Sequence, residues 1–141
     1  MKYYKTLIPL DIYKYLFQVI LTDNGHEFFD VNNIECIHST SEYVTRLFFC
    51  DPHASRQKGM IEKNHEFIRY VLPKGSSFKN ITQVDCNLIM NNINSLCRDS
   101  LNGKSPYEAM LFLCDEYILK TLNCYYIEPD NVDLSDNLLK Y

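Results

Sequence analysis

The sequence predicts an α/β fold that begins with two short buried strands and continues mostly as helix. Two apolar, β-branched runs lie in the N-terminal part of the chain, and apolar residues recur at helical spacing from about residue 60 onward. The length of 141 residues corresponds to one domain, and 46% hydrophobic with 23% charged residues is ordinary for a globular protein. We therefore expect one α/β domain with few strands.

The first predicted strand covers residues 18–22, QVILT, and the second covers residues 43–50, YVTRLFFC. Continuous apolar runs of this length are typical of strands that are buried on both faces. Such strands need neighbours along their edges, and the sequence supplies few of them. Either the region before residue 18 contains a further strand, or part of the sheet is missing from the chain.

Helices are predicted before, between and after the two strands. Pro73 and Gly75 form a stop signal after an apolar helical stripe. Two later helices begin at Thr82 and Ser105, because each is followed three positions later by the acidic residue of a capping box. The predicted helices lie at residues 10–17, 30–37, 60–72, from 82 onward, from 105 onward and at 115–122.

Charge is distributed unevenly along the chain. The net charge of −4 is not that of a typical nucleic-acid-binding protein. Between Arg46 and Lys79, however, seven basic residues outnumber three acidic ones. This distribution favours contact between the middle of the chain and an anion, although most charge runs are simply solvated surfaces.

The six cysteines and the apolar N-terminus indicate a cytoplasmic protein that does not enter a membrane. No two cysteines have C-x-x-C spacing, and each has apolar neighbours, so we expect buried thiols rather than zinc ligands or disulfides. The first residues, MKYYKTLIPLDIYKYLFQVIL, are interrupted by polar residues and by Pro9. This pattern fits neither a signal peptide nor a membrane span.

Two carboxylates occupy positions that suit a metal site. Asp23 follows the first strand in the stretch LTDNGHEF, and Glu62 falls in the first turn of the helix after the second strand. Carboxylates on rigid elements hold hard divalent cations, and two such ions can stabilise the attacking and leaving oxygens of phosphoryl transfer. By residue type alone, a hairpin turn at Asn24-Gly25 and a solvated helix face at Glu62 are the commoner explanations.

Three separate blocks resemble the transposases of the insertion-sequence family numbered thirty, which are retroviral-integrase-like enzymes of the DDE superfamily. The blocks are LTDNGHEF at 21–28, FFCDPHASRQKGMIEKNHEFIRYVLPKG at 48–75 and INSLCRDSLNGKSPYEA at 93–109. The similarity covers about residues 10–115. It implies an RNase-H-like (integrase core) fold, truncated at its N-terminal side and followed by helices. Residues 1–115 would be the C-terminal part of that core, and residues 116–141 an acidic tail.

The resemblance also assigns roles to residues of this chain. Asp23 and Glu62 correspond to two of the three catalytic carboxylates, which bind Mg²⁺ or Mn²⁺. Basic residues near Glu62 would position transposon ends and target DNA, and polar neighbours would support the site by hydrogen bonds. The basic residues are Lys58, Lys63 and Arg69, and the polar ones are Asn24, Gln57 and Asn64.

Departures from the family pattern limit what we expect of this chain by itself. Nothing before residue 18 resembles the strand that carries the family's first carboxylate, and Asp11 lies in a predicted helix. The helix-turn-helix region of such transposases has no counterpart either. His53 and Arg56 replace expected aromatic residues, and a proline expected near Cys97 is missing. We therefore expect no DNA strand transfer by the chain alone.

Three functional alternatives remain open at this point. The chain is an enzyme fragment that works with an upstream transposase piece, a non-catalytic module that binds DNA or an intact transposase, or an inactive transposon relic. A complementing piece with the missing aspartate would favour the first, and salt-sensitive DNA binding without cleavage the second. A molten, aggregation-prone product would favour the relic.

Overall fold

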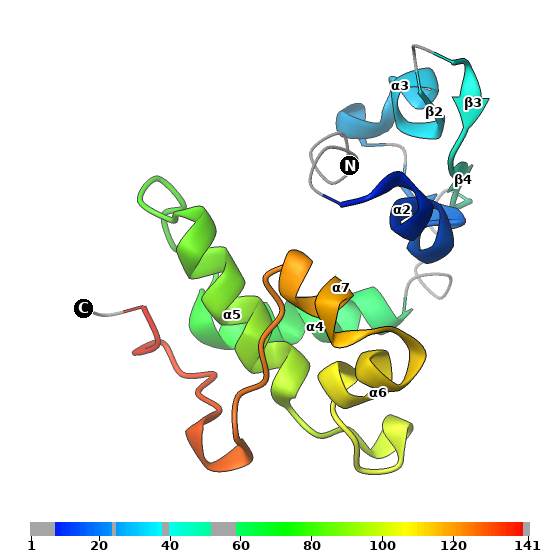
Figure 1. The fold of residues 1–141 in the computed structure, drawn as a ribbon. Helices are drawn as coiled ribbons and strands as arrows, with labels where there is room; N and C mark the ends of the chain where they lie inside the picture. The colour runs from blue at the N-terminus through cyan, green and yellow to red at the C-terminus, as the bar shows by residue number, and fades with distance from the viewer. Residues whose placement is uncertain (1–7, 24, 38–39, 52–58, 140–141) are drawn as a thin grey trace. The chain divides into compact units, whose positions relative to one another are not determined.

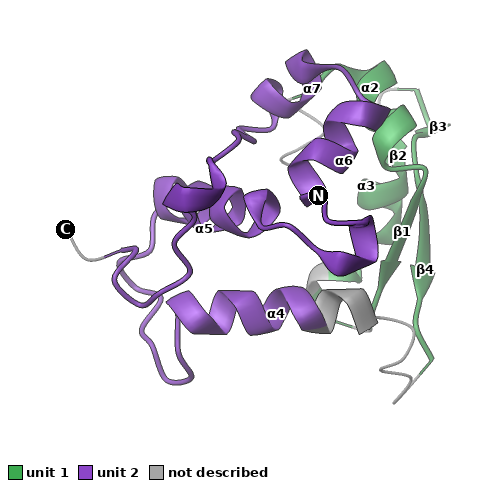
Figure 2. Cartoon of the chain, turned by 90° about the horizontal axis from the view of Figure 1, so that it is seen from below, with its two compact units in different colours: residues 1–58 green, residues 59–141 purple. Residues whose placement is uncertain are grey.

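The computed structural model describes residues 8–23, 25–37, 40–51 and 59–139 (Figure 1). The chain divides into two compact units, residues 1–58 and residues 59–141, which are described one at a time (Figure 2). Helix and strand are both present, as the α/β prediction requires. The predicted division into residues 1–115 and an acidic tail from 116 to 141 stays a prediction.

The first unit contains two small sheets and short helices. Strands β1 and β4 are parallel, with Val19 opposite Arg46 and Thr22 opposite Phe49. The strand predicted at 18–22 is confirmed, and the one predicted at 43–50 is confirmed only over Arg46–Phe49, because Tyr43 pairs with Cys36 in the other sheet. The elements of this unit are α2 (Leu10–Leu16), β1 (Val19–Thr22), η1 (His26–Phe28), α3 (Val31–Glu35), β2 (Cys36–Ile37), β3 (Glu42–Tyr43) and β4 (Arg46–Phe49).

The helix predicted at 30–37 is shorter than expected. Asp30 caps it as predicted, because its side chain accepts a hydrogen bond from the Asn33 amide. The helix ends at Glu35, and Cys36–Ile37 then pairs with Glu42–Tyr43 as an antiparallel ribbon. Cross-strand pairing therefore replaces the last helical turn, a competition between tertiary and local structure that single-sequence patterns do not resolve.

The hairpin alternative for Asn24-Gly25 is wrong. Hairpin turns of the asparagine–glycine type need positive φ at both central residues. Gly25 instead has φ −64° and ψ 145°, and the chain continues into η1. The partner of β1 is β4, which runs parallel to it, and parallel strands require a crossover connection rather than a tight turn.

Strands β1 and β4 were expected to be buried on both faces, and this prediction is wrong for the chain on its own. Thr22 and Leu47 are buried, but Val19 is 61% exposed, Leu21 44% and Phe48 55%. The physical reason is that the sheet in the described residues has only two strands. A pair of strands has too little protein around it to cover both faces.

The two outer edges of this strand pair differ. The Arg46 and Cys50 amides donate to the Gln18 and Thr22 carbonyls at 3.0 and 2.7 Å. Alternate residues of each strand therefore direct their backbone groups outward. On β4 the outward amide of Leu47 donates to a Glu35 carboxylate oxygen at 2.8 Å. On β1 the outward groups belong to Val19 and Leu21, and no strand in the described part of the chain pairs with them.

The second unit is helical, with a small core between α4 and α5. Val71, Ile89 and Ile93 form this core. Both predicted capping boxes are present, at Thr82 and at Ser105. The elements are α4 (Gly59–Val71), α5 (Gln83–Ser95), η3 (Asp99–Leu101), α6 (Pro106–Leu113), α7 (Glu116–Thr121) and η4 (Pro129–Asn131).

The extended segment that follows α7 runs beside α5 (Figure 1), and polar side chains of α5 form hydrogen bonds with it. The Asn91 side chain accepts from the Tyr125 amide at 3.1 Å and donates to a backbone carbonyl of the same segment. Ser95 accepts from the Ile127 amide at 2.9 Å, and Asn92 accepts from the Asp133 amide at 2.8 Å. These bonds give partners to backbone groups of the segment that follows α7 and fix it along α5.

Replacing Asn92 with alanine is expected to lower the free energy of unfolding by about 1–3 kcal/mol, because the buried Asn92 side chain loses two hydrogen bonds, one of them from the Asp133 amide. Asn92 is 2% exposed and also donates to the Leu88 carbonyl at 3.0 Å. Urea unfolding followed by circular dichroism measures the change. Asn87→Ala is the control, because it removes only a surface bond to Gln83, worth up to about 0.5 kcal/mol. Equal losses in both variants would contradict the assignment.

Candidate metal and nucleic-acid site

Asp23 lies at the carboxyl end of a strand, as the sequence predicts. It directly follows β1, whose last residue Thr22 is 3% exposed. The Thr22 carbonyl accepts a hydrogen bond from the Cys50 amide, and this bond fixes the backbone immediately before the carboxylate. Asp23 itself is exposed.

Asp51 is a second carboxylate at the same edge of the sheet, and it was not among the residues predicted from the sequence. It follows β4 closely, and β4 runs parallel to β1 with Thr22 opposite Phe49. The carboxyl ends of parallel strands meet at one edge, where α/β proteins commonly bind ligands. A strand followed by Asp51 was visible in the sequence, but the parallel pairing that brings it near Asp23 was not.

Glu62 lies in the first turn of α4, as predicted, and its side chain is outside the described residues. Asn24, Gln57 and Lys58 also lie outside them. Glu62 belongs to the second unit and Asp23 to the first, so their meeting at one metal site stays a prediction. Within the described part of the chain, no group of three or more histidine, cysteine or acidic side chains is arranged to hold a metal ion.

The donor chemistry that is present fits a hard cation. Asp23 and Asp51 offer carboxylate oxygens, which Mg²⁺ and Mn²⁺ prefer to nitrogen or sulfur ligands. Both residues follow strands, which are the rigid supports that a metal site needs. Cys50, which directly follows β4, is buried.

Lys63 on α4 is exposed and already paired. Its ammonium lies 2.8 Å from a Glu66 carboxylate oxygen. The hydrogen bond and charge of Glu66 raise the pKa of Lys63, and Lys63 in turn lowers the pKa of Glu66. An exposed pair of this kind is weak, so a phosphate can compete for Lys63 at little cost.

Asn64 accepts a hydrogen bond from Arg98, a residue that was not predicted from the sequence to belong to the site. The Arg98 guanidinium donates to the Asn64 side-chain oxygen at 3.1 Å and to the Ile93 carbonyl at 3.5 Å. It also lies 5.3 Å from the centre of the Phe67 ring. Burial lowers the pKa of Arg98. Arg98 thus joins α4 to the loop after α5, and a contact between residues 34 positions apart leaves no local signal.

Arg98→Ala is expected to destabilise the second unit by roughly 1.5–3 kcal/mol, the usual range for hydrogen bonds to a charged group. Lysine cannot reproduce the planar fork of donors, so Arg98→Lys should restore only part of the loss. Urea unfolding measures both variants. Arg69→Ala on α4 is the matched control, because an exposed surface change usually stays within about 0.5 kcal/mol. Full rescue by lysine would show that charge alone matters.

Comparisons with known proteins identify the relatives of this chain. No protein-family model matches it, and no solved structure does. It is 34% identical over 65 residues to the transposase for insertion sequence element IS1086 of Cupriavidus metallidurans, covering 46% of this chain and 19% of that protein. It is 30% identical over 95 residues to the transposase for IS4351 of Bacteroides fragilis, covering 67% of this chain and 28% of that protein. The chain is a homologue of insertion-sequence transposases.

The resemblance to the family numbered thirty is confirmed by a further match. Transposase InsI for insertion sequence element IS30A of Escherichia coli is 32% identical over 65 residues, which is 46% of this chain and 17% of that protein. The aligned part thus spans only about a sixth to a quarter of the length of these relatives. The RNase-H-like topology of this transposase homologue stays a prediction.

None of the helices in the described part of the transposase homologue combines the length and the apolar character that crossing a bilayer requires.

Proposed function

We propose that this transposase homologue is part of a DDE-type catalytic region that cleaves and joins DNA strands during transposition. Asp23 and Glu62 are its metal ligands, and Asp51 lies beside Asp23 at the same sheet edge. Bound Mg²⁺ or Mn²⁺ would stabilise charge on the attacking and leaving oxygens of the phosphodiester. Lys58, Lys63 and Arg69 position transposon ends and target DNA, and Asn24, Gln57 and Asn64 support the site. The protein would act in the cytoplasm, where bacterial DNA lies.

The observation that carries this proposal is the position of Asp23 after a parallel strand. A carboxylate at the carboxyl end of such a strand is rigidly held yet open to ligands. The charge of the middle segment supports it, because seven basic residues between Arg46 and Lys79 suit a phosphate backbone. Homology to transposases over about half to two-thirds of the chain supports the same activity.

We further propose that the isolated chain does not transfer DNA strands and that a second polypeptide segment completes it. The outward backbone groups of Val19 and Leu21 offer an edge to an added strand. The exposed apolar residues of β1 and β4 offer a face that a fuller sheet would cover. That segment would be an upstream transposase fragment or part of an intact transposase, and it would bring the third carboxylate.

A strand-transfer assay tests the proposal. The chain is incubated with Mg²⁺ or Mn²⁺, labelled transposon-end DNA and plasmid target, either alone or with the part of the IS4351 transposase that lies outside the aligned segment. Joined product only in the mixture is expected. Product from the chain alone would contradict its dependence on a second segment. No product from any mixture, with the intact IS4351 transposase active in parallel, would contradict the catalytic role.

A non-catalytic module is the second candidate, because the local excess of positive charge suits DNA binding with or without catalysis. Such a module would bind DNA, with an affinity that falls steeply with salt concentration, without cutting it. Alternatively, it would bind an intact transposase through the exposed β1 edge. An inactive relic would do neither and would unfold without a cooperative transition.

A further inference from the structure

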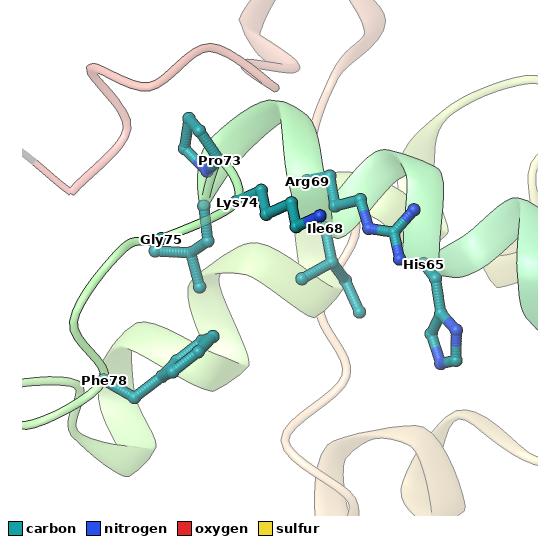
Figure 3. A pocket seen from close by; sticks show the side chains of 8 residues that line it. His65, Ile68, Arg69, Pro73, Lys74, Gly75 and Phe78 are labelled. Atoms are coloured by element: carbon teal, nitrogen blue, oxygen red, sulfur yellow. The ribbon is translucent and has the colours of Figure 1, made fainter.

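A hollow of about 300 Å³ lies beside the C-terminal half of α4, entirely within the second unit (Figure 3). We call it the α4 hollow. Its lining includes Ile68 and Arg69 from the helix, Lys74 and Gly75 from the turn that follows, and Phe78 from the next segment. The volume is at the lower end of the range for small-ligand pockets, which is about 300–1,000 Å³.

A tight turn after α4 shapes this hollow. The Ser76 amide donates to the Pro73 carbonyl at 3.0 Å, which closes a four-residue turn. Gly75 has φ +97°, a conformation that a type II turn requires at its third position and that side chains disfavour. The turn reverses the chain, so that Phe78 borders the same space as Ile68 (Figure 3).

The residues that line the α4 hollow combine apolar side chains with two cationic ones, Arg69 and Lys74. Phe78 is 67% exposed, so most of its ring is accessible to a ligand. Within the described residues neither Arg69 nor Lys74 forms an ion pair, and the lining contains no carboxylate. The nearest acid on this part of α4, Glu66, lies 2.8 Å from Lys63, and Arg69 adds only a smaller effect to its lowered pKa.

We infer that the α4 hollow binds one unpaired nucleotide of single-stranded DNA. The base stacks on Phe78 against Ile68, and its phosphate lies between Arg69 and Lys74. Aromatic platforms beside cations are the usual means of holding unpaired bases. A duplex keeps its base faces covered, so it cannot use Phe78 in this way. The inference rests on the proposed DNA-joining function, in which the second unit would hold an unpaired nucleotide near the DNA end that is joined.

Fluorescence anisotropy with the whole chain tests the stacking contact. The probe is a fluorescein-labelled 12-nucleotide oligothymidylate, with an abasic strand of equal length and a 12-base-pair duplex for comparison. Phe78→Ala is expected to weaken binding of the oligothymidylate about 5- to 100-fold. It should leave the abasic strand and the duplex unchanged, and Phe78→Tyr should restore affinity. Phe112→Ala, which removes an 89% exposed ring elsewhere in the same unit, is the control and should change nothing.

The phosphate contacts are tested by the salt dependence of oligothymidylate binding. The double change Arg69→Gln with Lys74→Gln should reduce the slope of log affinity against log salt by about 0.7, the value for one phosphate on a single strand, and each single change should reduce it by less. Lys79→Gln removes the same charge outside the hollow and should leave the slope nearly unchanged.

The outcomes separate this inference from the proposed function. Binding of duplex without Phe78-dependent binding of the oligothymidylate overturns the α4 hollow as a nucleotide site and leaves the proposed DNA role intact. Equal losses for Phe78→Ala and Phe112→Ala, or an equal loss on the abasic strand, overturn it as well. Binding of none of the three probes overturns both. Phe78-dependent binding without strand transfer in any mixture supports the inference and contradicts the catalytic proposal.

Discussion

Asp23→Asn is expected to abolish DNA joining in the mixture of this chain with its complementing segment. Asparagine keeps the shape of the side chain but removes the negative charge that binds Mg²⁺. Loss of an outer-shell partner alone costs 10- to 100-fold in many metal sites, so loss of a ligand should lower the rate of joining by at least about 100-fold. Quantification of joined product over time, with Mg²⁺ and then with Mn²⁺, measures the effect.

Glu62→Gln should have the same effect from the second unit, because the proposal places both carboxylates at one metal site. Matched controls exist in each unit. Asp11→Asn changes an exposed carboxylate on α2, and Glu66→Gln changes one that lies a turn beyond Glu62 on α4. Both controls should retain nearly full activity. If Glu62→Gln behaves like Glu66→Gln, the assignment of Glu62 as a ligand fails.

Leu21→Pro is expected to weaken association with the complementing segment by at least about tenfold. The amide of Leu21 points to the open edge of β1, so proline removes a donor that an added strand would use. Proline is tolerated on an edge strand when its nitrogen faces outward, so the pairing of β1 with β4 should survive. Co-sedimentation with the tagged complementing segment measures association, and circular dichroism monitors the fold.

Two control variants separate the backbone effect from other effects of this change. Leu21→Thr keeps the backbone amide and changes only an exposed side chain, so it should retain most of the association. Ile20→Pro removes a donor directed at β4 and should unfold the first unit instead. Association of Leu21→Pro at the strength of the parent chain would show that the partner does not add a strand at this edge.

Local signals in the sequence were sufficient for most elements of the fold. Capping boxes at Thr82 and Ser105 and the stop at Pro73 and Gly75 each act within a few residues, and the helices are where they predict. Strand β4 was recognised from its apolar run in the same way, although it covers only Arg46–Phe49 of the predicted 43–50. The exceptions are Cys36–Ile37 and Glu42–Tyr43, which pair with each other as a short antiparallel ribbon instead of extending the predicted helix and strand.

The candidate site was predictable only in part. Asp23 and Glu62 were predicted because both lie in sequence blocks that resemble the transposase family. Asp23 also follows a predicted strand, and Glu62 lies in the first turn of a predicted helix. The position of Asp51 near Asp23 and the hydrogen bond from Arg98 to Asn64 were not predicted. Each depends on contact between segments that lie far apart in the chain. The α4 hollow was not predicted either. It depends on the turn at Gly75, which places Phe78 at the same space as Ile68.

By itself the sequence determined the α/β character, the kinship with insertion-sequence transposases and the placement of Asp23 at a strand end. These features follow from local propensity and from motifs that survive in a linear pattern. Only the tertiary structure decided that β1 and β4 are parallel, that Glu35 covers one edge and that the edge of β1 is unpaired in the described residues. Strand order and edge coverage are set by contacts between distant residues, and alternation along one strand carries no information about its neighbours.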